Sequence, residues 1–123
     1  MKWLVATACA VLGMSLPSLA FAHAFPENSS PHVGASVQVS PPQVEIWFNA
    51  DLEPLFDQLV VKDAHGKIVS VGDATVDAKN PALLTVHLQP ALPPGQYHVY
   101  WHVTARDGHR TVGDFVFSVG PGT

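Results

Sequence analysis

Sulfur-containing residues are scarce in this chain, which has one cysteine and two methionines among its 123 residues. Cys9, Met1 and Met14 all lie within the first 22 residues. If that segment is removed, the remaining chain can form no disulfide. It also has no thiolate or thioether with which to bind a soft metal ion such as Cu(I).

The first 22 residues have the features of a secretory signal peptide. Lys2 supplies a positive charge, residues 3–16 are almost entirely apolar, and residues 20–22 read Ala-Phe-Ala, a small-x-small cleavage site. Pro17 interrupts the apolar run before it reaches the roughly 20 residues that span a membrane. We therefore expect cleavage after Ala22 and a single domain over residues 23–123.

Basic residues are also few, with six Lys and Arg against ten Asp and Glu and a net charge of −4. This balance argues against a surface that binds a nucleic-acid backbone. No phosphate-binding loop, cysteine nucleophile or recognisable Ser-His-Asp arrangement is found in the sequence. The sequence thus gives no support to a hydrolase, and we expect a protein that is not an enzyme.

Helical periodicity is missing after residue 22, and short alternating apolar runs separated by Pro and Gly take its place. The clearest run is 97–104, where Tyr97 and Trp101 alternate with polar neighbours. Residues 72–81 and the tail after residue 119 are expected to be irregular. The pattern predicts an all-β sandwich or barrel of about seven strands, over residues 35–39, 44–49, 58–62, 67–71, 84–88, 97–104 and 112–119.

The seven histidines all lie at or after residue 23. His23 would become the first residue after cleavage, so that its α-amine and imidazole Nδ1 could chelate one metal ion. Nitrogen donors in a plane suit Cu(II), which stands highest in the divalent affinity order. The alternative is that His23 follows the cleavage site by chance.

A second candidate lies at Asp107-Gly108-His109. Residues i and i+2 of an extended chain point to the same side, so a carboxylate and an imidazole can converge there. Gly108 permits a close approach of the backbone. With His23, the two side chains would complete a set of three nitrogens and one oxygen. The alternative is a polar turn with a solvated His109.

These segments resemble the CopC family of periplasmic copper-binding proteins. The resemblance spans nearly the whole chain after residue 22 and rests on 23–25, 45–48, 92–101, 107–109 and 113–117. It implies an immunoglobulin-like Greek-key sandwich and one type-2 Cu(II) site with His23, Asp107 and His109 as ligands. It also implies a periplasmic copper carrier or buffer for copper resistance or supply. A separate CopD-type membrane transporter would be its partner, and we expect a monomer.

Two departures from the family pattern affect this expectation. Some members carry a methionine-rich Cu(I) site in the middle of the chain, but residues 72–83 contain no Met, so we expect no Cu(I) site. Some members place a Glu near the copper, where this chain has Ala50. The neighbouring Asp51 is expected to point elsewhere.

Several alternatives stay open. His98 and His102 could form a second, weaker metal site, or one of them could orient a copper ligand. An N-terminal histidine chelate also builds the copper site of lytic polysaccharide monooxygenases, so a copper-dependent oxidase is an alternative function. A sandwich that binds no metal and serves adhesion is a third. His32, His65 and His87 are expected to be solvated.

Overall fold

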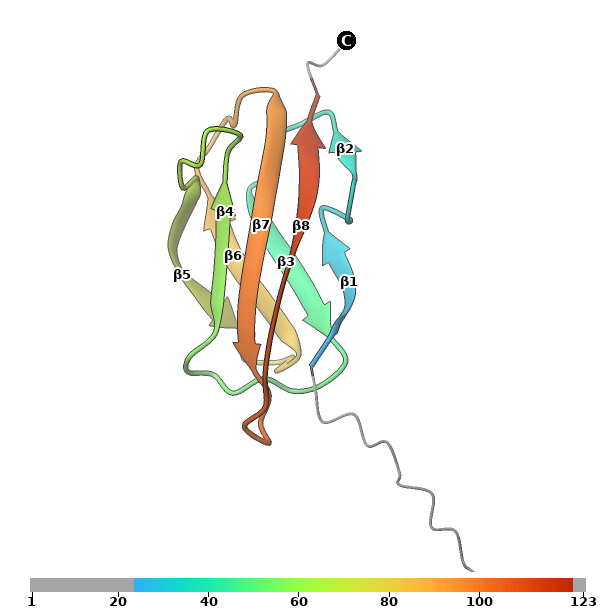
Figure 1. Ribbon diagram of the computed structural model, residues 1–123, viewed down its shortest axis with the longest axis vertical. Helices are drawn as coiled ribbons and strands as arrows, with labels where there is room; N and C mark the ends of the chain where they lie inside the picture. The colour runs from blue at the N-terminus through green and yellow to red at the C-terminus, as the bar shows by residue number, and fades with distance from the viewer. Residues whose placement is uncertain (1–23, 121–123) are drawn as a thin grey trace, which may run out of the picture.

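The computed structural model describes residues 24–120, which form two four-stranded sheets packed face to face (Figure 1). The expected signal peptide and His23 lie outside the described residues. The first sheet has the order β1 (Pro26–Ser30), β3 (Gln43–Phe48), β6 (Leu83–Leu88) and β5 (Ser70–Val76). The second has the order β2 (Ser36–Val37), β8 (Arg110–Val119), β7 (Gly95–Thr104) and β4 (Gln58–Lys62). Within residues 24–120 there is no helix that could cross a membrane.

The strand order confirms the expected immunoglobulin-like sandwich. All pairs are antiparallel except β2 with β8, and the two sheets correspond to the ABED and GFC sheets of that fold. The hydroxyl of Tyr97, near the start of β7, donates a hydrogen bond of 2.5 Å to the carbonyl of Pro93. A tyrosine bonded back to the chain just upstream is a known feature of this position in such sandwiches.

The core lies between the sheets and is built from alternate residues of the central strands. On β7, Tyr97, Val99, Trp101 and Val103 are all buried, as the sequence predicts. The Trp101 ring meets Phe48 of the other sheet edge to face, with centroids 5.3 Å apart. Such aromatic pairs contribute about 0.5–1.5 kcal/mol beyond their buried area. The contact ties β7, which leads into the site described below, to the opposite sheet.

Strand β1 is not predicted by the sequence, and the fold has eight strands rather than about seven. Its sequence, Pro-Glu-Asn-Ser-Ser, has no apolar alternation. Four of its five residues are exposed and only Ser29 is buried. Backbone pairing with β3 at the edge of the sheet holds this strand, and a side-chain pattern cannot reveal such pairing.

The fourth strand predicted from the sequence lies at a different position in the structure, where it is β5. A strand was expected at 67–71 and irregular chain at 72–81, but β5 runs through Ser70–Val76. This edge strand carries a register irregularity between Val71 and Thr75, and Gly72 has a φ of +74°. A bulge breaks the period of two on which the prediction depends. The predicted strand at 35–39 is likewise reduced to Ser36–Val37.

Candidate metal site

The connection between β7 and β8 is a tight turn that projects from one end of the sandwich (Figure 1). The amide of Ala105 donates to the carbonyl of His109 at 2.9 Å, and the amide of Gly108 donates to the carbonyl of Ala105 at 2.8 Å. Gly108 has a φ of +93°, a conformation that glycine adopts without steric cost. The glycine between Asp107 and His109 therefore lets the chain reverse at this point.

Asp107 and His109 are brought together at this turn. One carboxylate oxygen of Asp107 accepts a hydrogen bond from the backbone amide of His109 at 3.0 Å. The other, Oδ2, lies 3.0 Å from Nδ1 of the His109 ring. The Asp107 side chain is 37% exposed and that of His109 is 55% exposed. A carboxylate and an imidazole thus share one solvent-accessible point. The two residues converge as expected, but through a turn at Gly108 rather than along an extended chain.

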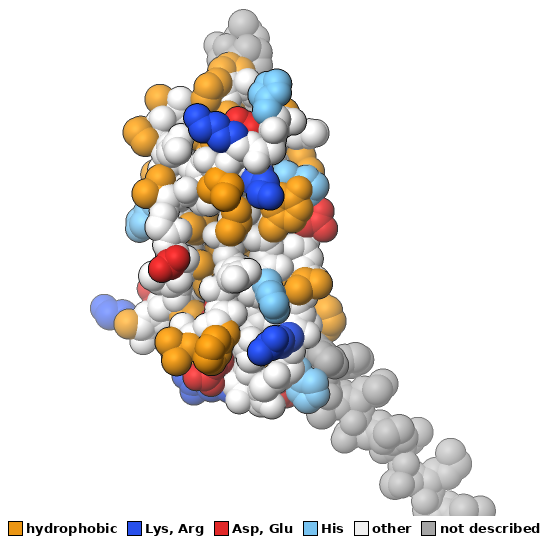
Figure 2. Space-filling view, turned by 60° about the vertical axis from the view of Figure 1, so that its left-hand side comes forward, with side chains coloured by type: hydrophobic (Ala, Val, Ile, Leu, Met, Phe, Trp, Pro, Cys, Tyr) orange, Lys and Arg blue, Asp and Glu red, His pale blue; other side chains and the backbone are white. Residues whose placement is uncertain are grey.

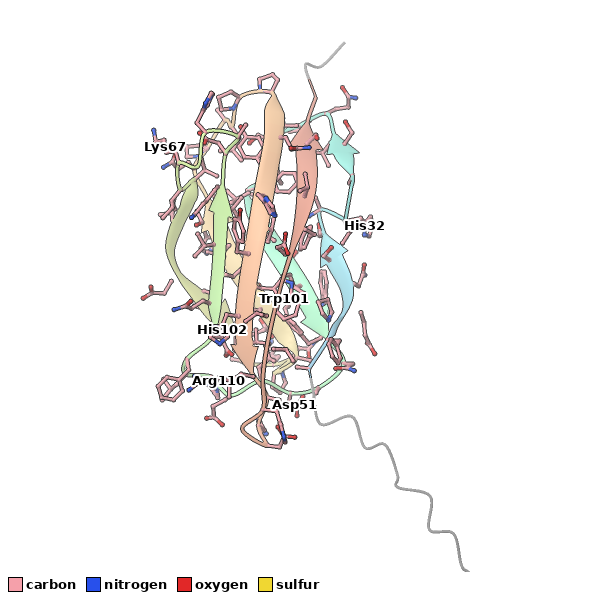
Figure 3. All side chains as sticks on the ribbon, viewed as in Figure 1. His32, Asp51, Lys67, Trp101, His102 and Arg110 are labelled. Carbon is pink, nitrogen blue, oxygen red and sulfur yellow. The ribbon has the colours of Figure 1, made fainter. Side chains whose placement is uncertain are left out.

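A neighbouring loop braces the base of this turn. The amide of Glu53 donates to the carbonyl of Thr104 at 2.8 Å, and the amide of Arg106 donates to the carbonyl of Asp51 at 3.2 Å. The Asp51 carboxylate lies 4.0 Å from the Arg106 guanidinium, at the same end of the sandwich as His102 and Arg110 (Figure 3). Whether Asp51 points away from a copper ion stays a prediction. The loop thereby fixes the turn to the sandwich on the side where β7 enters it.

The first described residues are held at the same end. The hydroxyl of Thr111, on β8, donates a hydrogen bond of 2.7 Å to the carbonyl of Ala24, and Ala24 is fully buried. Phe25 exchanges two hydrogen bonds with Asn49, of 2.8 and 2.9 Å. The chain therefore enters the fold beside the first residues of β8.

Asp57 holds the end of β7, where the turn begins. Its Oδ1 accepts a hydrogen bond of 2.9 Å from the amide of Thr104, the last residue of β7. Its Oδ2 and the Thr104 hydroxyl are buried without a partner among the described residues. Burial raises the pKa of Asp57, while the Thr104 hydrogen bond opposes that rise. Glu53 adds to the rise by repulsion and His102 reduces it by attraction.

The remaining histidines do not gather around this point. His32, His65 and His87 are exposed, as expected, and Figure 2 shows histidine side chains scattered over the visible face. His98 stacks on Tyr100 and contacts Asp114 at 2.5 Å. His102 lies four residues further along β7, about 13 Å away at the usual rise of a strand. That separation argues against a single metal ion held by His98 and His102. His102 lies near enough to Asp57 to lower the pKa of that carboxyl by attraction.

Within residues 24–120, no three His, Cys, Asp or Glu residues form a group that could hold a metal ion. Asp107 and His109 supply two donors, and His23 lies outside this range. The structure also reveals three residues that sequence reasoning missed: Thr111 and Asn49, which hold the start of the chain, and Asp57, which supports the turn. No local motif marks them, because each acts on a residue at least 24 positions away.

The fold and the turn define an immunoglobulin-like sandwich with an exposed carboxylate–imidazole pair beside its first strand. The CopC domain family matches residues 26–120, and the chain belongs to this family. The prediction of a CopC relationship from the sequence is thereby confirmed.

Two curated relatives are similar over most of this chain. The Copper transport protein CutJ of Bacillus subtilis is 34% identical over 105 residues. These cover 85% of this chain but 19% of CutJ, so the chain spans about a fifth of that relative. Protein YobA of Escherichia coli K12 is 32% identical over 114 residues, which cover 91% of each chain.

Solved structures agree on the fold. CopC from Methylosinus trichosporium OB3b superposes with a TM-score of 0.76 and 33% identity, covering 82% of this chain and 97% of that one. PcoC, a methionine-rich copper resistance protein of Escherichia coli, gives a TM-score of 0.69 at 22% identity, covering 79% and 98%. At that identity, the likeness to PcoC supports the fold alone.

Proposed function

We propose that this protein binds one Cu(II) ion through the α-amine and imidazole of His23, the carboxylate of Asp107 and the imidazole of His109. The ion is its cargo, which it carries or buffers in the periplasm for copper resistance or supply, without catalysis. The observation that carries the proposal is the Asp107–His109 pair on a turn beside the anchored Ala24.

The anchoring of Ala24 limits where the preceding residue can reach. Consecutive Cα atoms are about 3.8 Å apart, and the Ala24 carbonyl is bonded to Thr111, two residues after His109. Ala24, the residue that follows His23 in the sequence, is therefore held beside the start of β8. This supports His23 as the source of the donors that residues 24–120 do not supply.

The donor set fits Cu(II) better than Cu(I). Three nitrogens and one oxygen suit the tetragonal geometry of Cu(II), whereas Cu(I) prefers thiolates and thioethers. No Cys or Met occurs after residue 22. In the observed rotamer, Nδ1 of His109 lies 3.0 Å from Oδ2 of Asp107, so these two donor atoms already face the point that one ion would occupy.

A carrier fits the shape of the site better than an oxidase. The turn projects from the end of the sandwich (Figure 1), whereas an oxygenase that acts on a polymer needs a flat surface around its metal. A carboxylate ligand also occupies a coordination position that an oxygenase would need to keep open. The copper-dependent oxidase is therefore the less favoured function.

The transport partner would be a separate membrane protein. CutJ, named a copper transport protein, is about five times as long as the segment that matches this chain. We propose that a CopD-type transporter is the partner of this protein. As a second chain, it would take the role that the remainder of CutJ has within one chain. The protein itself would act as a monomer.

The proposal is tested by titrating Cu(II) into two purified forms, one beginning at His23 and one with a single extra residue before it. Tryptophan fluorescence and electron paramagnetic resonance are recorded together. The form that begins at His23 should bind one equivalent with a nitrogen-rich tetragonal spectrum, and the extended form should bind much more weakly.

His87→Gln serves as the matched control, because His87 is exposed on the other sheet and should leave the titration unchanged. Equal binding by both N-terminal forms would show that the α-amine is not a ligand. Peroxide-dependent turnover by the copper-loaded form would favour the oxidase instead.

A further inference from the structure

A hollow of about 590 Å³ lies along the open side of the sandwich, between the edge strand β1 and the first half of β8. Its volume is within the range of sites that bind small molecules or short peptide segments. The two strands belong to different sheets and are not paired with each other. The lining of the hollow includes Glu27, Trp101, Gly113, Asp114 and Phe115.

One wall of the hollow is an unpaired strand edge. The carbonyl of Val116 accepts from Gly34, and the amide of Ser118 donates to Ala35. The even-numbered residues of β8 therefore turn their backbone groups away from β7. Strand β2 pairs only with Ser118 and Val119, so among the described residues the edge groups of Val112 and Asp114 have no strand partner.

The floor of the hollow is shaped by Gly113. A Cβ atom at this position would lie 2.3 Å from Cζ2 of the Trp101 ring. The missing side chain lets the ring lie directly beneath the β8 backbone, and Phe115 lines the same hollow. An apolar floor beside an open edge is the arrangement that binds an extended peptide by adding a strand, with pockets for alternate side chains.

The negative charge of the residues that line the hollow favours a partner with a basic side chain. Among the residues that the structure describes, Glu27 and Asp114 line the hollow and no Lys or Arg does. Both acidic residues are exposed. One oxygen of Asp114 is engaged with His98. Two carboxylates beside an apolar floor favour a segment that carries a basic side chain among small or β-branched residues.

We propose that the edge of β8 at Val112 and Asp114 binds an extended protein segment bearing a Lys or Arg, which adds a strand in line with β2. Main-chain hydrogen bonds to Val112 and Asp114 supply its affinity, and Glu27 and Asp114 supply its preference for a basic residue. The proposal does not depend on a copper site at the neighbouring turn.

The test uses a blocked peptide of sequence Thr-Val-Lys-Val-Thr-Val, titrated into the ¹⁵N-labelled, metal-free protein from residue 23 onward. We expect saturable shifts of the Val112 and Asp114 amide resonances and slower exchange of these amide hydrogens. Replacing Lys by Glu in the peptide should weaken binding at least about fivefold. Methylating alternate peptide nitrogens, in the register that faces β8, should abolish binding.

Two protein variants complete the test. Val112→Pro removes an edge N–H without removing a bond to β7 and should abolish binding, whereas Val112→Thr keeps the N–H and should bind normally. Glu27→Lys should weaken binding, whereas Asp73→Lys, exposed on β5, makes the same change of charge elsewhere and should not.

The two peptide comparisons test strand addition and the charge preference even if Val112→Pro does not fold. Equal binding of the methylated and unmethylated peptides would overturn strand addition, and equal binding of the Lys and Glu peptides would overturn the charge preference. Edge amides already protected in a concentration-dependent way without peptide would show that a second copy occupies the edge, and would overturn the proposal.

Discussion

The hydroxyl of Thr111 donates a hydrogen bond of 2.7 Å to the carbonyl of Ala24, across 87 positions of sequence. Thr111 lies two residues beyond His109, at the start of β8. The bond ties the beginning of the described chain to the strand that leaves the Asp107–His109 turn. Two segments that the sequence separates by most of its length thereby become neighbours.

Replacing Thr111 with Val removes this hydrogen bond while keeping the shape of the side chain. A neutral hydrogen bond contributes about 1 kcal/mol, so we expect Cu(II) affinity to fall about fivefold if the bond positions the donors of residue 23. The affinity is measured by competition titration. Thr75→Val, at an exposed position of β5, is the control, and an equal loss there would remove the role given to Thr111.

The two donors at the turn should differ in their contribution to copper binding. We expect His109→Ala to weaken Cu(II) binding more than Asp107→Ala, because Cu(II) generally gains more from an imidazole nitrogen than from a carboxylate oxygen. Competition titrations of both variants against the same chelator give the ranking. The reverse order would contradict it and would make Asp107 the principal ligand of the turn.

Copper binding should weaken as the pH falls from 7 to 5. An α-amine has a pKa of about 7.7–8.0 and an imidazole of about 6.5, and both must lose their protons to bind the metal. The proposed set contains one amine and two imidazoles, so three competing protons predict a decrease of more than about a hundredfold over this range. The form with an extra residue before His23 should show a shallower slope, and a flat profile for the form that begins at His23 would exclude this ligand set.

Asp57 should make the fold less stable as the pH rises. Burial raises the pKa of this carboxyl above its value in the unfolded chain. The stabilisation from its bound proton is therefore fully present below the unfolded pKa and is lost as the pH passes the folded pKa. Asp57→Asn keeps an acceptor for the Thr104 amide and places a donor at the position of the unpartnered Oδ2.

We expect Asp57→Asn to raise the Tm by a few degrees at pH 7, with a smaller gain at pH 4. Thermal unfolding followed by circular dichroism at several pH values measures the difference. Asp73→Asn makes the same charge change at an exposed position and controls for net charge. A gain that is independent of pH would contradict the assigned cause.

Gly113→Ala should destabilise the protein by overpacking. The added Cβ would lie 2.3 Å from Cζ2 and 2.6 Å from Cε2 of Trp101, so the ring or the strand must shift. Overpacking of this kind costs about 1–3 kcal/mol, measured by urea unfolding. Gly120→Ala meets no atom closer than 3.6 Å, and its stability should be nearly unchanged.

The sequence by itself determined the fold class and the central strands. Residues alternate between core and surface along most of β7 and the second half of β8, because each strand has one face in the core. Tyr97, Trp101, Phe115 and Phe117 are all buried as predicted. The pairing of Asp107 with His109 was also predictable, because both residues belong to one short segment. In such cases the physical cause lies within a few neighbouring residues.

Only the tertiary structure decided what depends on distant contacts. Strand β1 is held by the backbone of β3, and β5 is displaced by a bulge, so neither leaves an alternating pattern. The anchoring of Ala24 by Thr111 and the support of Thr104 by Asp57 join residues 87 and 47 positions apart. Hydrogen bonds over such separations form only when packing of the sheets brings the partners together, and no local pattern of residues records them.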